Sequence, residues 1–301
     1  ASVKKVAAAA GTKFANAGGL FYNILAESMD LSKADTSGMT TMTNMFYGCN
    51  NLKTLNLSGF DTSNVTNMYM MFADCCSLTS LDLSGFDTSK VTTMYAMFSG
   101  CQSLTSLNLS GLNTANVQIM DEMFYDCTSL TSLNLSSFNT ANAVTMKYMF
   151  ENCSSLAALD LSGFNTSKVT NMSKMFRECE SLTSLDLRNF DTSNVSDMGQ
   201  MFYCCRGLKS LNVGSFDTSN VENMSYMFAQ CNVLESLDLS SFDTSNVKSM
   251  NTMFEYCSAL TELDLSSFDT ANVETIPMQL HISLYTARIR VSAAATRAII
   301  L

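Results

Sequence analysis

Cysteine is the residue type in this chain with the widest possible chemistry, and it recurs at one fixed interval. Nine of the 11 cysteines stand four residues after the first residue of a Met-Phe pair: Cys49, Cys75, Cys101, Cys127, Cys153, Cys179, Cys205, Cys231 and Cys257. A zinc site needs closely spaced Cys and His ligands, but there is no CxxC pair and the only histidine is His281. We therefore predict no metal site and no cofactor.

Two interpretations of this cysteine ladder follow if the repeats stack. Neighbouring rungs would lie about 4.8 Å apart, which is a separation that a disulfide tolerates. An odd number of rungs pairs badly, however, and a free cysteine behaves as a small buried hydrophobe. We favour free, buried thiols for the ladder. Cys76 and Cys204 stand beside the ladder and are the candidates for exposed thiols.

Serine and aspartate are abundant, and both could take part in catalysis. A Ser-His-Asp triad needs a histidine, but His281 lies in the part of the chain that does not repeat. The pattern singles out no pair of buried carboxylates for acid-base work, and it contains no phosphate-binding loop. The sequence therefore predicts that the protein is not an enzyme.

These residues are positioned by a block of 26 residues that recurs nine times between about Leu31 and Ile276. Its Met-Phe pairs start at Met45, Met71, Met97, Met123, Met149, Met175, Met201, Met227 and Met253. A strict period of this length predicts a solenoid, in which each unit buries its apolar side against its neighbours. We expect an N-terminal cap over residues 1–30, the solenoid over 31–276, and a C-terminal cap or atypical tail over 277–301.

Each block predicts a strand. Residues 78–83 have the LxxLxL spacing of a leucine-rich repeat, with Leu81 and Leu83 pointing inward and Ser80 and Asp82 outward. Strands of this kind stack into one parallel β-sheet, whose inner face is covered by the rest of each coil. The fold class is therefore a leucine-rich-repeat-like solenoid with a parallel sheet on one face.

The remainder of each block predicts a corner and a short turn. The threonine that occurs once in every corner, such as Thr88, can hydrogen-bond local backbone groups and close the corner. The spacing of Met71, Phe72 and Cys75 predicts one or two helical turns, and a single helix over residues 65–75 is the alternative. Short extended segments and short helical turns would then complete each coil.

The outward strand positions are small and polar, as in Ser80 and Asp82 or Ser106 and Asn108. Such residues make poor interface hot spots, so this face is predicted to be solvated. Stacked carboxylates, Asp160 with Asp186 and Asp238 with Asp264, could hold a divalent cation weakly. That hypothesis is disfavoured, because Ca²⁺ takes six to eight oxygen ligands.

The positions that vary from block to block flank the Met-Phe pair, and they contain eight of the ten tyrosines. Tyrosine among small polar residues is typical of adaptable recognition surfaces. We predict seven of these tyrosines as binding residues: Tyr69, Tyr95, Tyr125, Tyr148, Tyr203, Tyr226 and Tyr256. The alternative is that each ring only packs across adjacent coils, with its hydroxyl in water.

Charge and hydropathy exclude two kinds of partner. The net charge is -10, and the 17 Lys and Arg residues are scattered, whereas nucleic-acid binding needs a basic stripe. We therefore expect no nucleic-acid partner. No run approaches the roughly 18 apolar residues of a membrane span, so the chain is not predicted to cross a membrane.

The pattern NVTNM, MF, C, SLTSLDLSGFDTS closely resembles the 26-residue repeat of bacterial surface proteins, the BspA-like class of leucine-rich repeats. The resemblance covers about 240 of the 301 residues in nine copies. It implies a solenoid displayed at the cell surface or outside the cell, with a role in adhesion or in binding host proteins. It also implies a protein or surface-glycan partner.

Two functions are therefore compared. The first is a non-catalytic cell-surface or secreted module for protein binding or adhesion. The second is a structural or self-assembling solenoid without a dedicated ligand. Oligomeric state separates them: capped ends favour a monomeric binder, and an array that polymerises favours assembly.

Overall fold

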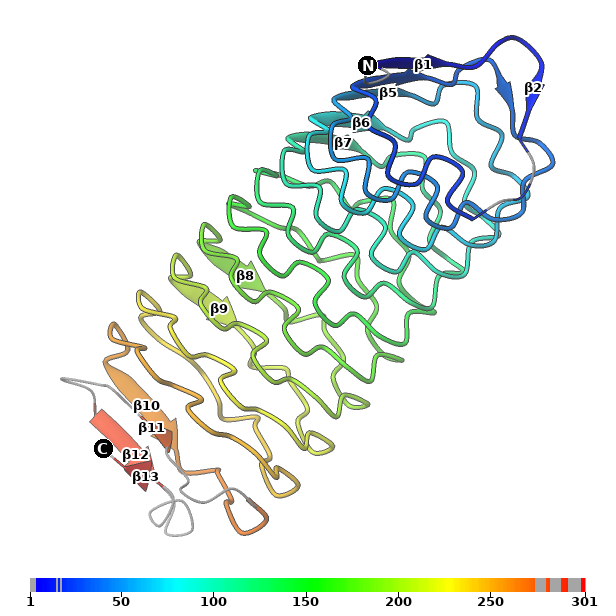
Figure 1. Ribbon diagram of the computed structural model, residues 1–301. Helices are drawn as coiled ribbons and strands as arrows, with labels where there is room; N and C mark the ends of the chain where they lie inside the picture. The colour runs from blue at the N-terminus through cyan, green and yellow to red at the C-terminus, as the bar shows by residue number, and fades with distance from the viewer. Residues whose placement is uncertain are drawn as a thin grey trace. The chain divides into compact units, whose positions relative to one another are not determined.

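The computed structural model describes residues 4–14, 16, 18–273, 280–281, 288–291 and 299–300. Within these residues the chain winds into successive coils whose strands pair in parallel (Figure 1). It divides into two compact units, unit 1 over Ala1–Ala143 and unit 2 over Val144–Leu301. The predicted parallel solenoid is confirmed, and each unit is described by itself.

Unit 1 contains three sets of parallel strands. The strand β3 (Ser28–Asp30) lies between β1 (Lys5–Ala7) and β5 (Thr54–Asn56), β6 (Ser80–Asp82) pairs with β7 (Ser106–Asn108), and β2 (Thr12–Lys13) pairs with β4 (Ala34–Asp35). Leu81 lies opposite Leu107, one sequence period away. The register between β3 and β5 and between β6 and β7 is therefore the period of the repeat, while residues 5–7 pair with β3 at an offset of 23 residues.

Unit 2 follows the same rule. The strand β8 (Ser184–Asp186) pairs with β9 (Ser210–Asn212), β10 (Glu262–Leu265) with β12 (Arg288–Val291), and β11 (Leu280–His281) with β13 (Ile299–Ile300), all in parallel. Glu262 lies opposite Arg288, again one period away. The described pairs of the tail thus extend the parallel arrangement. Ile276 and Pro277, where the repeat identity stops, lie outside the described residues.

The predicted helical turns are wrong, because no helix occurs in the described residues. Around each Met-Phe pair, alternate backbone amides close tight turns: Met71 N donates to Met68 O (3.3 Å) and Cys75 N to Phe72 O (3.2 Å). The amides between them reach the next coil, as in Phe72 N to Met97 O (3.0 Å). An α-helix needs every amide for its own ladder, so this sharing between coils excludes it.

The tight turns place two residues of every repeat at positive φ. They are the residue before the Met-Phe pair (Asn44, Met70, Ala96, Glu122, Tyr148, Lys174, Gln200, Tyr226, Thr252) and the second residue after it (Gly48, Asp74, Gly100, Asp126, Asn152, Glu178, Cys204, Gln230, Tyr256). The left-handed region is unfavourable for residues other than glycine. Since such different side chains adopt it, the stacked turns dictate the backbone there.

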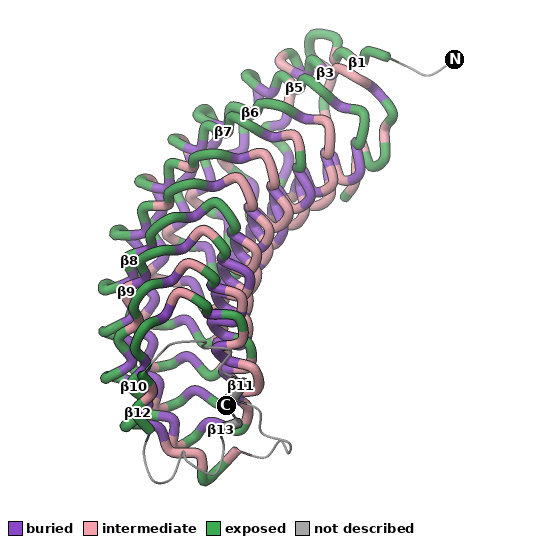
Figure 2. Tube along the Cα trace, turned by 90° about the vertical axis from the view of Figure 1, so that its left-hand side faces the viewer, coloured by how far each residue is buried: buried purple, intermediate pink, exposed green. Residues whose placement is uncertain are grey.

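Rows of apolar side chains fill the inside of the coils. The buried residues, to which they belong, are coloured purple along the chain in Figure 2. Phenylalanine rings stack from coil to coil, with centroids 5.5 Å apart for Phe46 and Phe72 and 5.7 Å apart for Phe176 and Phe202. The thiols of the ladder cysteines donate to the carbonyl oxygen of a phenylalanine one coil earlier, as Cys101 Sγ does to Phe72 O (3.2 Å). The ladder cysteines are free and buried, as favoured above.

The prediction that the two other cysteines are exposed is wrong for Cys204, and Cys76 is not fully exposed either. Cys76 is half-buried, whereas Cys204 is only 4% exposed. Cys204 Sγ donates to Gln230 Oε1 (3.2 Å), which covers it from the following coil. A position beside the ladder is therefore no guarantee of an exposed thiol.

Thiol reactivity should reflect this burial. Burial raises the pKa of Cys179 and of Cys257 to about 12, so almost no thiolate exists at pH 8. We expect one rapidly reacting thiol, Cys76, when the native protein is titrated with a chromogenic disulfide, and the other ten only after unfolding. Cys76→Ser, which matches Ser154 at the same repeat position, should remove the rapid phase. Loss of that phase in Cys204→Ser instead would contradict this assignment.

The corner threonines bond to the next coil and not to local groups, which corrects the prediction above. Thr88 Oγ1 donates to Asn113 O (2.8 Å) and accepts from Asn113 N (2.8 Å). The same pair of bonds joins Thr62 to Asp87 and Thr218 to Asp243. These threonines are buried, and their hydroxyls link neighbouring coils by hydrogen bonds.

The aspartates of the corners cap local turns. Asp61 Oδ1 accepts from the backbone amide of Ser63 (3.0 Å) and from its hydroxyl (2.7 Å), and Asp217 does the same with Ser219. The serine hydroxyl, and then the serine amide, hold the pKa of Asp61 and that of Asp217 below the usual value. The pattern recurs in both units, so its effect on stability accumulates.

Stability should consequently fall in acid. A carboxyl whose pKa is lower in the folded than in the unfolded state stabilises the fold above its unfolded pKa of about 3.9. That stabilisation is lost as the pH falls through the lowered folded pKa. We expect the melting temperature to be nearly constant from pH 7 to about 5 and to drop steeply below about 4. The drop should persist in 1 M NaCl, and its disappearance there would indicate charge repulsion instead of lost turn caps.

Candidate binding face

Each unit has a variable face, formed by the outward side chains around its Met-Phe pairs. These lie within residues 43–50, 69–76, 95–102 and 121–128 in unit 1, and within 147–154, 173–180, 199–206, 225–232 and 251–258 in unit 2. All seven predicted tyrosines lie on these two faces. Five are half-buried, while Tyr226 is 38% and Tyr256 51% exposed. Their role in binding remains a prediction.

In unit 1 the tyrosines stack on one another. The ring centroids of Tyr69 and Tyr95 are 4.9 Å apart, and those of Tyr22 and Tyr47 are 5.1 Å apart. Packing across coils, the alternative stated above, thus occurs here. Tyr22 belongs to this aromatic surface and is 50% exposed. No repeat position marks Tyr22 as part of this surface, because it precedes the repeats.

Each of two phenols in unit 1 meets a carboxylate. Tyr95 Oη donates to Glu122 Oε1 (2.7 Å), and the Asp74 side chain lies close enough to the Tyr47 phenol to perturb its pKa. Burial, followed by the Glu122 carboxylate, raises the pKa of Tyr95, and the Asp74 carboxylate raises that of Tyr47. Both phenols therefore stay protonated, and both carboxylates are held beside an aromatic ring.

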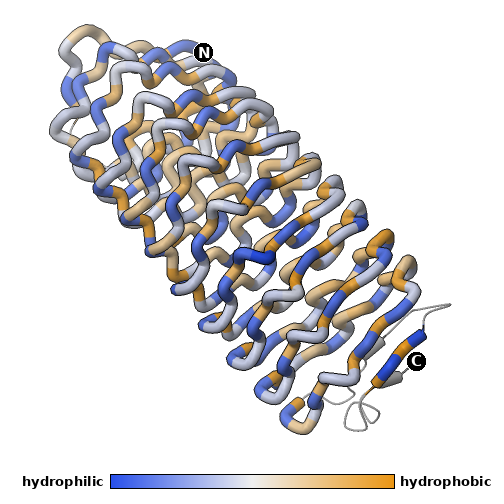
Figure 3. Tube along the Cα trace, turned by 180° about the vertical axis from the view of Figure 1, so that it is seen from behind, coloured by the Kyte–Doolittle hydropathy of each residue, from blue (hydrophilic) through white to orange (hydrophobic). Residues whose placement is uncertain are grey.

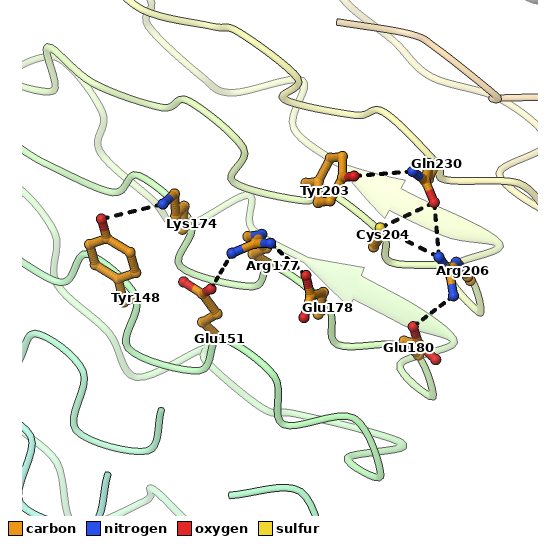
Figure 4. A network of polar contacts seen from close by, with 10 residues as sticks. All are labelled: Tyr148, Glu151, Lys174, Arg177, Glu178, Glu180, Tyr203, Cys204, Arg206 and Gln230. Carbon is orange, nitrogen blue, oxygen red and sulfur yellow. Dashed lines mark hydrogen bonds and ion pairs between the residues drawn. The ribbon is translucent and has the colours of Figure 1, made fainter. Parts of the chain in front are cut away.

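In unit 2 cations lie over the tyrosine rings (Figure 4). Lys174 Nζ is 4.7 Å from the centroid of the Tyr148 ring and 3.4 Å from its hydroxyl. The Arg177 guanidinium carbon is 5.4 Å from the centroid of the Tyr203 ring. Such contacts contribute about 0.5 to 2 kcal/mol, depending on how far they are desolvated. They fix the long cationic side chains in place.

The same arginine carries a buried ion pair. Arg177 Nη1 lies 2.5 Å from Glu151 Oε1, and its Nη2 lies 2.6 Å from Glu178 Oε1. Glu151 is only 3% exposed, and burial raises its pKa although Arg177 opposes the rise. Glu151 Oε2 and Arg177 Nε have no hydrogen-bond partner among the described residues. The sequence indicated neither residue. The only signal was charge at a position that holds Tyr, Ala or Ser in the other blocks except the last, where Glu255 stands.

A second part of this network links three coils. Gln230 Nε2 donates to Tyr203 Oη (3.1 Å), and Gln230 Oε1 accepts from Arg206 Nη2 (2.9 Å). Arg206 Nη1 donates to Glu180 Oε1 (3.0 Å). The Tyr203 ring also meets the edge of Tyr226, with centroids 6.1 Å apart. The variable face of unit 2 is thus a connected surface of aromatic, basic and acidic groups.

The strand face differs. Its hollow in unit 2 is lined by residues that include Asp160, Asp186 and Arg188, and Arg188 Nη2 lies 2.7 Å from Asp186 Oδ2. Asp186 therefore holds an arginine, and Asp264 lies 3.7 Å from Arg290 Nη1. Among the described residues, no group of three or more His, Cys, Asp or Glu side chains could hold a metal. On the strand face and at the other outward positions of the coils, polar residues recur from one coil to the next (Figure 3).

The parallel register, the inward leucines and the 26-residue coil define a leucine-rich-repeat solenoid. The chain belongs to the family described as "Mycoplasma protein of unknown function, DUF285", which matches residues 15–131, 104–210 and 183–283. These overlapping matches span the whole repeat region, and the resemblance to BspA-like repeats is confirmed. None of the curated proteins matches the chain.

Several solved leucine-rich-repeat structures are similar. A leucine rich cell surface protein from Faecalibacterium prausnitzii is 17% identical, over 99% of this chain and 90% of its own, with a TM-score of 0.44. A leucine-rich repeat protein from Bacteroides ovatus is 15% identical, over 96% of this chain and 83% of its own, with a TM-score of 0.42. The T. pallidum leucine-rich repeat protein is 23% identical, over 55% of this chain and 69% of its own, with a TM-score of 0.38. In the described part of the chain, no helix is long and apolar enough to cross a membrane.

Proposed function

We propose that this protein is a non-catalytic cell-surface or secreted module that binds a protein or surface-glycan partner through its variable face. One observation carries the proposal. The backbone at these positions is the same in every coil, including the residues at positive φ, while the side chains change from coil to coil. A scaffold of constant geometry with variable side chains is suited to recognition.

The chemistry of the variable face supports binding. Tyrosine and arginine are the residue types in which interface energy concentrates. Here Tyr148, Tyr203 and Arg177 are held by contacts to neighbouring coils, so binding would immobilise few additional side chains. By contrast, strand-face residues such as Ser184 and Ser210 are small and exposed.

The proposal includes no catalytic step. Glu151, the buried carboxylate on the variable face of unit 2, is bonded to Arg177, and the tyrosines around it bond to neighbouring side chains. Positioned contacts of this kind build a rigid surface. The repeat pattern supplies no Ser-His-Asp arrangement on it.

A random dodecapeptide library selected on the wild-type protein tests this function. Selected peptides should bind the variant Tyr148→Ala, Tyr203→Ala, Tyr226→Ala at least tenfold more weakly, since buried tyrosines at interfaces each contribute about 1 kcal/mol or more. Alanine already occupies the same repeat positions at Ala96 and Ala229, so the fold should persist. The readout is fluorescence anisotropy of labelled peptides, with circular dichroism to check the fold.

The matched control changes the strand face to Ser184→Ala, Ser210→Ala, Ser236→Ala, following Ala158 at the same position. Peptide affinity should stay within twofold. Peptides that bind the tyrosine variant as tightly as the wild type would exclude the variable face. If no such peptides emerge and the mass by sedimentation grows with protein concentration, the structural, self-assembling alternative is supported instead.

A further inference from the structure

We propose that the variable face of unit 1 binds a lysine- or arginine-rich segment of a partner protein. The inference deepens the proposed function, on which it rests, by stating the chemistry of one partner surface. It is carried by the pairs Tyr47 with Asp74 and Tyr95 with Glu122, and by a comparison with unit 2.

The segments around the Met-Phe pairs differ in charge between the two units. Residues 42–50, 68–76, 94–102 and 120–128 contain four acidic residues and no Lys, Arg or His. The equivalent segments of unit 2 contain four basic residues, Lys147, Lys174, Arg177 and Arg206, and four acidic ones, Glu151, Glu178, Glu180 and Glu255. The two units therefore share one repeat, but these segments are purely acidic in unit 1 and balanced in charge in unit 2.

Two of the carboxylates of unit 1 lie beside neutral phenols. A phenol donates to Glu122 (2.7 Å), and such a neutral donor leaves the negative charge in place. The Asp74 carboxylate likewise acts on a neutral phenol, that of Tyr47, whose pKa it raises. A carboxylate has about four acceptor sites, so one phenol leaves others for a further donor. Gly100, at positive φ, gives the Asp74 side chain its room, because a Cβ there would meet Asp74 Oδ1.

An aromatic surface lies beside these carboxylates. The rings of Tyr22 and Tyr47, and those of Tyr69 and Tyr95, stack in pairs and so keep fixed orientations. Tyr22 is 50% exposed. An aromatic ring attracts a cation through its negative face, and a carboxylate next to the ring adds to the attraction.

Unit 2 shows which group lies next to a tyrosine ring and a carboxylate. There Lys174 lies over Tyr148, and Arg177 lies over Tyr203 while binding Glu151 and Glu178. Where unit 2 has Glu151 and Arg177, unit 1 has Ala73 and Ser99 at the same repeat position. The segments around the Met-Phe pairs of unit 1 contain no Lys, Arg or His, so the cation in the equivalent arrangement would come from a partner.

The probe is a labelled octapeptide of alternating arginine and glycine, titrated at 0.15 M NaCl with anisotropy as the readout. Asp74→Asn with Glu122→Gln should weaken binding at least fivefold, and Tyr47→Ala with Tyr95→Ser should do the same without a change of charge. Each replacement occurs elsewhere in the chain at the same repeat position, at Asn152, Gln200, Ala73 and Ser173. Replacing the probe's arginines with glutamine should abolish binding.

The charge-matched control is Asp82→Asn with Asp87→Asn, which follows Asn108 and Asn113 and keeps the turn caps. Its affinity should stay within twofold of the wild type. Equal losses in both acidic variants, or no loss in the tyrosine variant, would reduce the binding to general attraction by an acidic protein and overturn the inference.

Failure of this inference can be told apart from failure of the proposed function. Library peptides that lose binding in Tyr47→Ala with Tyr95→Ser should be enriched in Lys and Arg relative to the library. If peptides bind the variable face without that enrichment, the proposed function stands and the cationic partner is wrong. If no peptide is directed to the variable face, the proposed function itself fails.

Discussion

Replacing Thr88 with valine is expected to lower the free energy of unfolding by about 2 to 5 kcal/mol, although valine has nearly the same shape. The Thr88 hydroxyl satisfies two backbone groups of the next coil, the amide and the carbonyl of Asn113. The Thr88 side chain is 0% exposed, and the two hydrogen bonds are partly buried. An unsatisfied buried polar group costs about 1 to 3 kcal/mol, and valine leaves two. The readout is the midpoint of urea unfolding followed by circular dichroism.

Thr88→Ser separates the hydroxyl from the methyl group. Serine keeps both hydrogen bonds and loses one methyl, which should cost about 1 kcal/mol. In unit 2, Thr218→Val should behave like Thr88→Val, because Thr218 makes the same two bonds to Asp243. If serine lowers the stability more than valine does, the corner threonines stabilise the fold by packing, and hydrogen bonding between coils is not their main contribution.

The sequence could predict those features that depend on the period. A parallel stack sets the register between Leu81 and Leu107 equal to the repeat length, so the sheet follows directly from the spacing. The inward leucines and the buried cysteine ladder follow from strand alternation and from the apolar company of the cysteines. Each of these features is a property of one residue position repeated many times.

The features that the sequence could not predict are decided between coils. The spacing of Met71, Phe72 and Cys75 buries all three side chains in a helical turn and in a run of tight turns alike. The choice depends on where the Phe72 amide donates, and its acceptor, Met97 O, lies in the next coil. The direction of the Thr88 hydroxyl was missed for the same reason. Gly48 and Gly100 were the only glycine signals for positive φ beside the Met-Phe pairs.

The variable face shows the same division. The tyrosines could be selected because their positions vary while their neighbours do not. Their partners could not, since Tyr95 meets a glutamate one coil away and Tyr203 meets an arginine of the preceding coil. The burial of Glu151 was also hidden, because the repeat position that it occupies holds half-buried Tyr47, Tyr125 and Tyr203 elsewhere.

Removal of Arg177 is expected to be more damaging than removal of the whole ion pair. Arg177→Ser would leave Glu151 buried and charged without its partner, at a cost of about 3 to 5 kcal/mol at pH 7. Glu151→Ala combined with Arg177→Ser copies Ala73 and Ser99 of unit 1 at the same repeat position. The double variant should therefore recover at least 2 kcal/mol of the loss. Urea unfolding of the full chain measures the free energy of unfolding of the single and of the double variant.

The pH dependence of Arg177→Ser identifies the cause. Burial already raises the pKa of Glu151, and loss of Arg177 removes the group that opposes this rise. A carboxyl whose pKa is higher in the folded state binds more protons there, so stability increases as the pH falls through that pKa. The deficit should thus shrink between pH 7 and about 5, before the turn-capping aspartates lose their contribution. A deficit that does not change with pH would mean that the damage comes from lost packing.

The double variant also separates stability from recognition. Arg177 lies over the Tyr203 ring and binds Glu178, so its loss removes one of the side-chain contacts that hold Tyr203. The hydrogen bond from Gln230 and the contact with the Tyr226 ring remain. If the variable face acts through pre-positioned side chains, the stable double variant should still bind selected peptides several-fold more weakly than the wild type. Recovery of stability together with full recovery of binding would show that Arg177 serves only to neutralise Glu151.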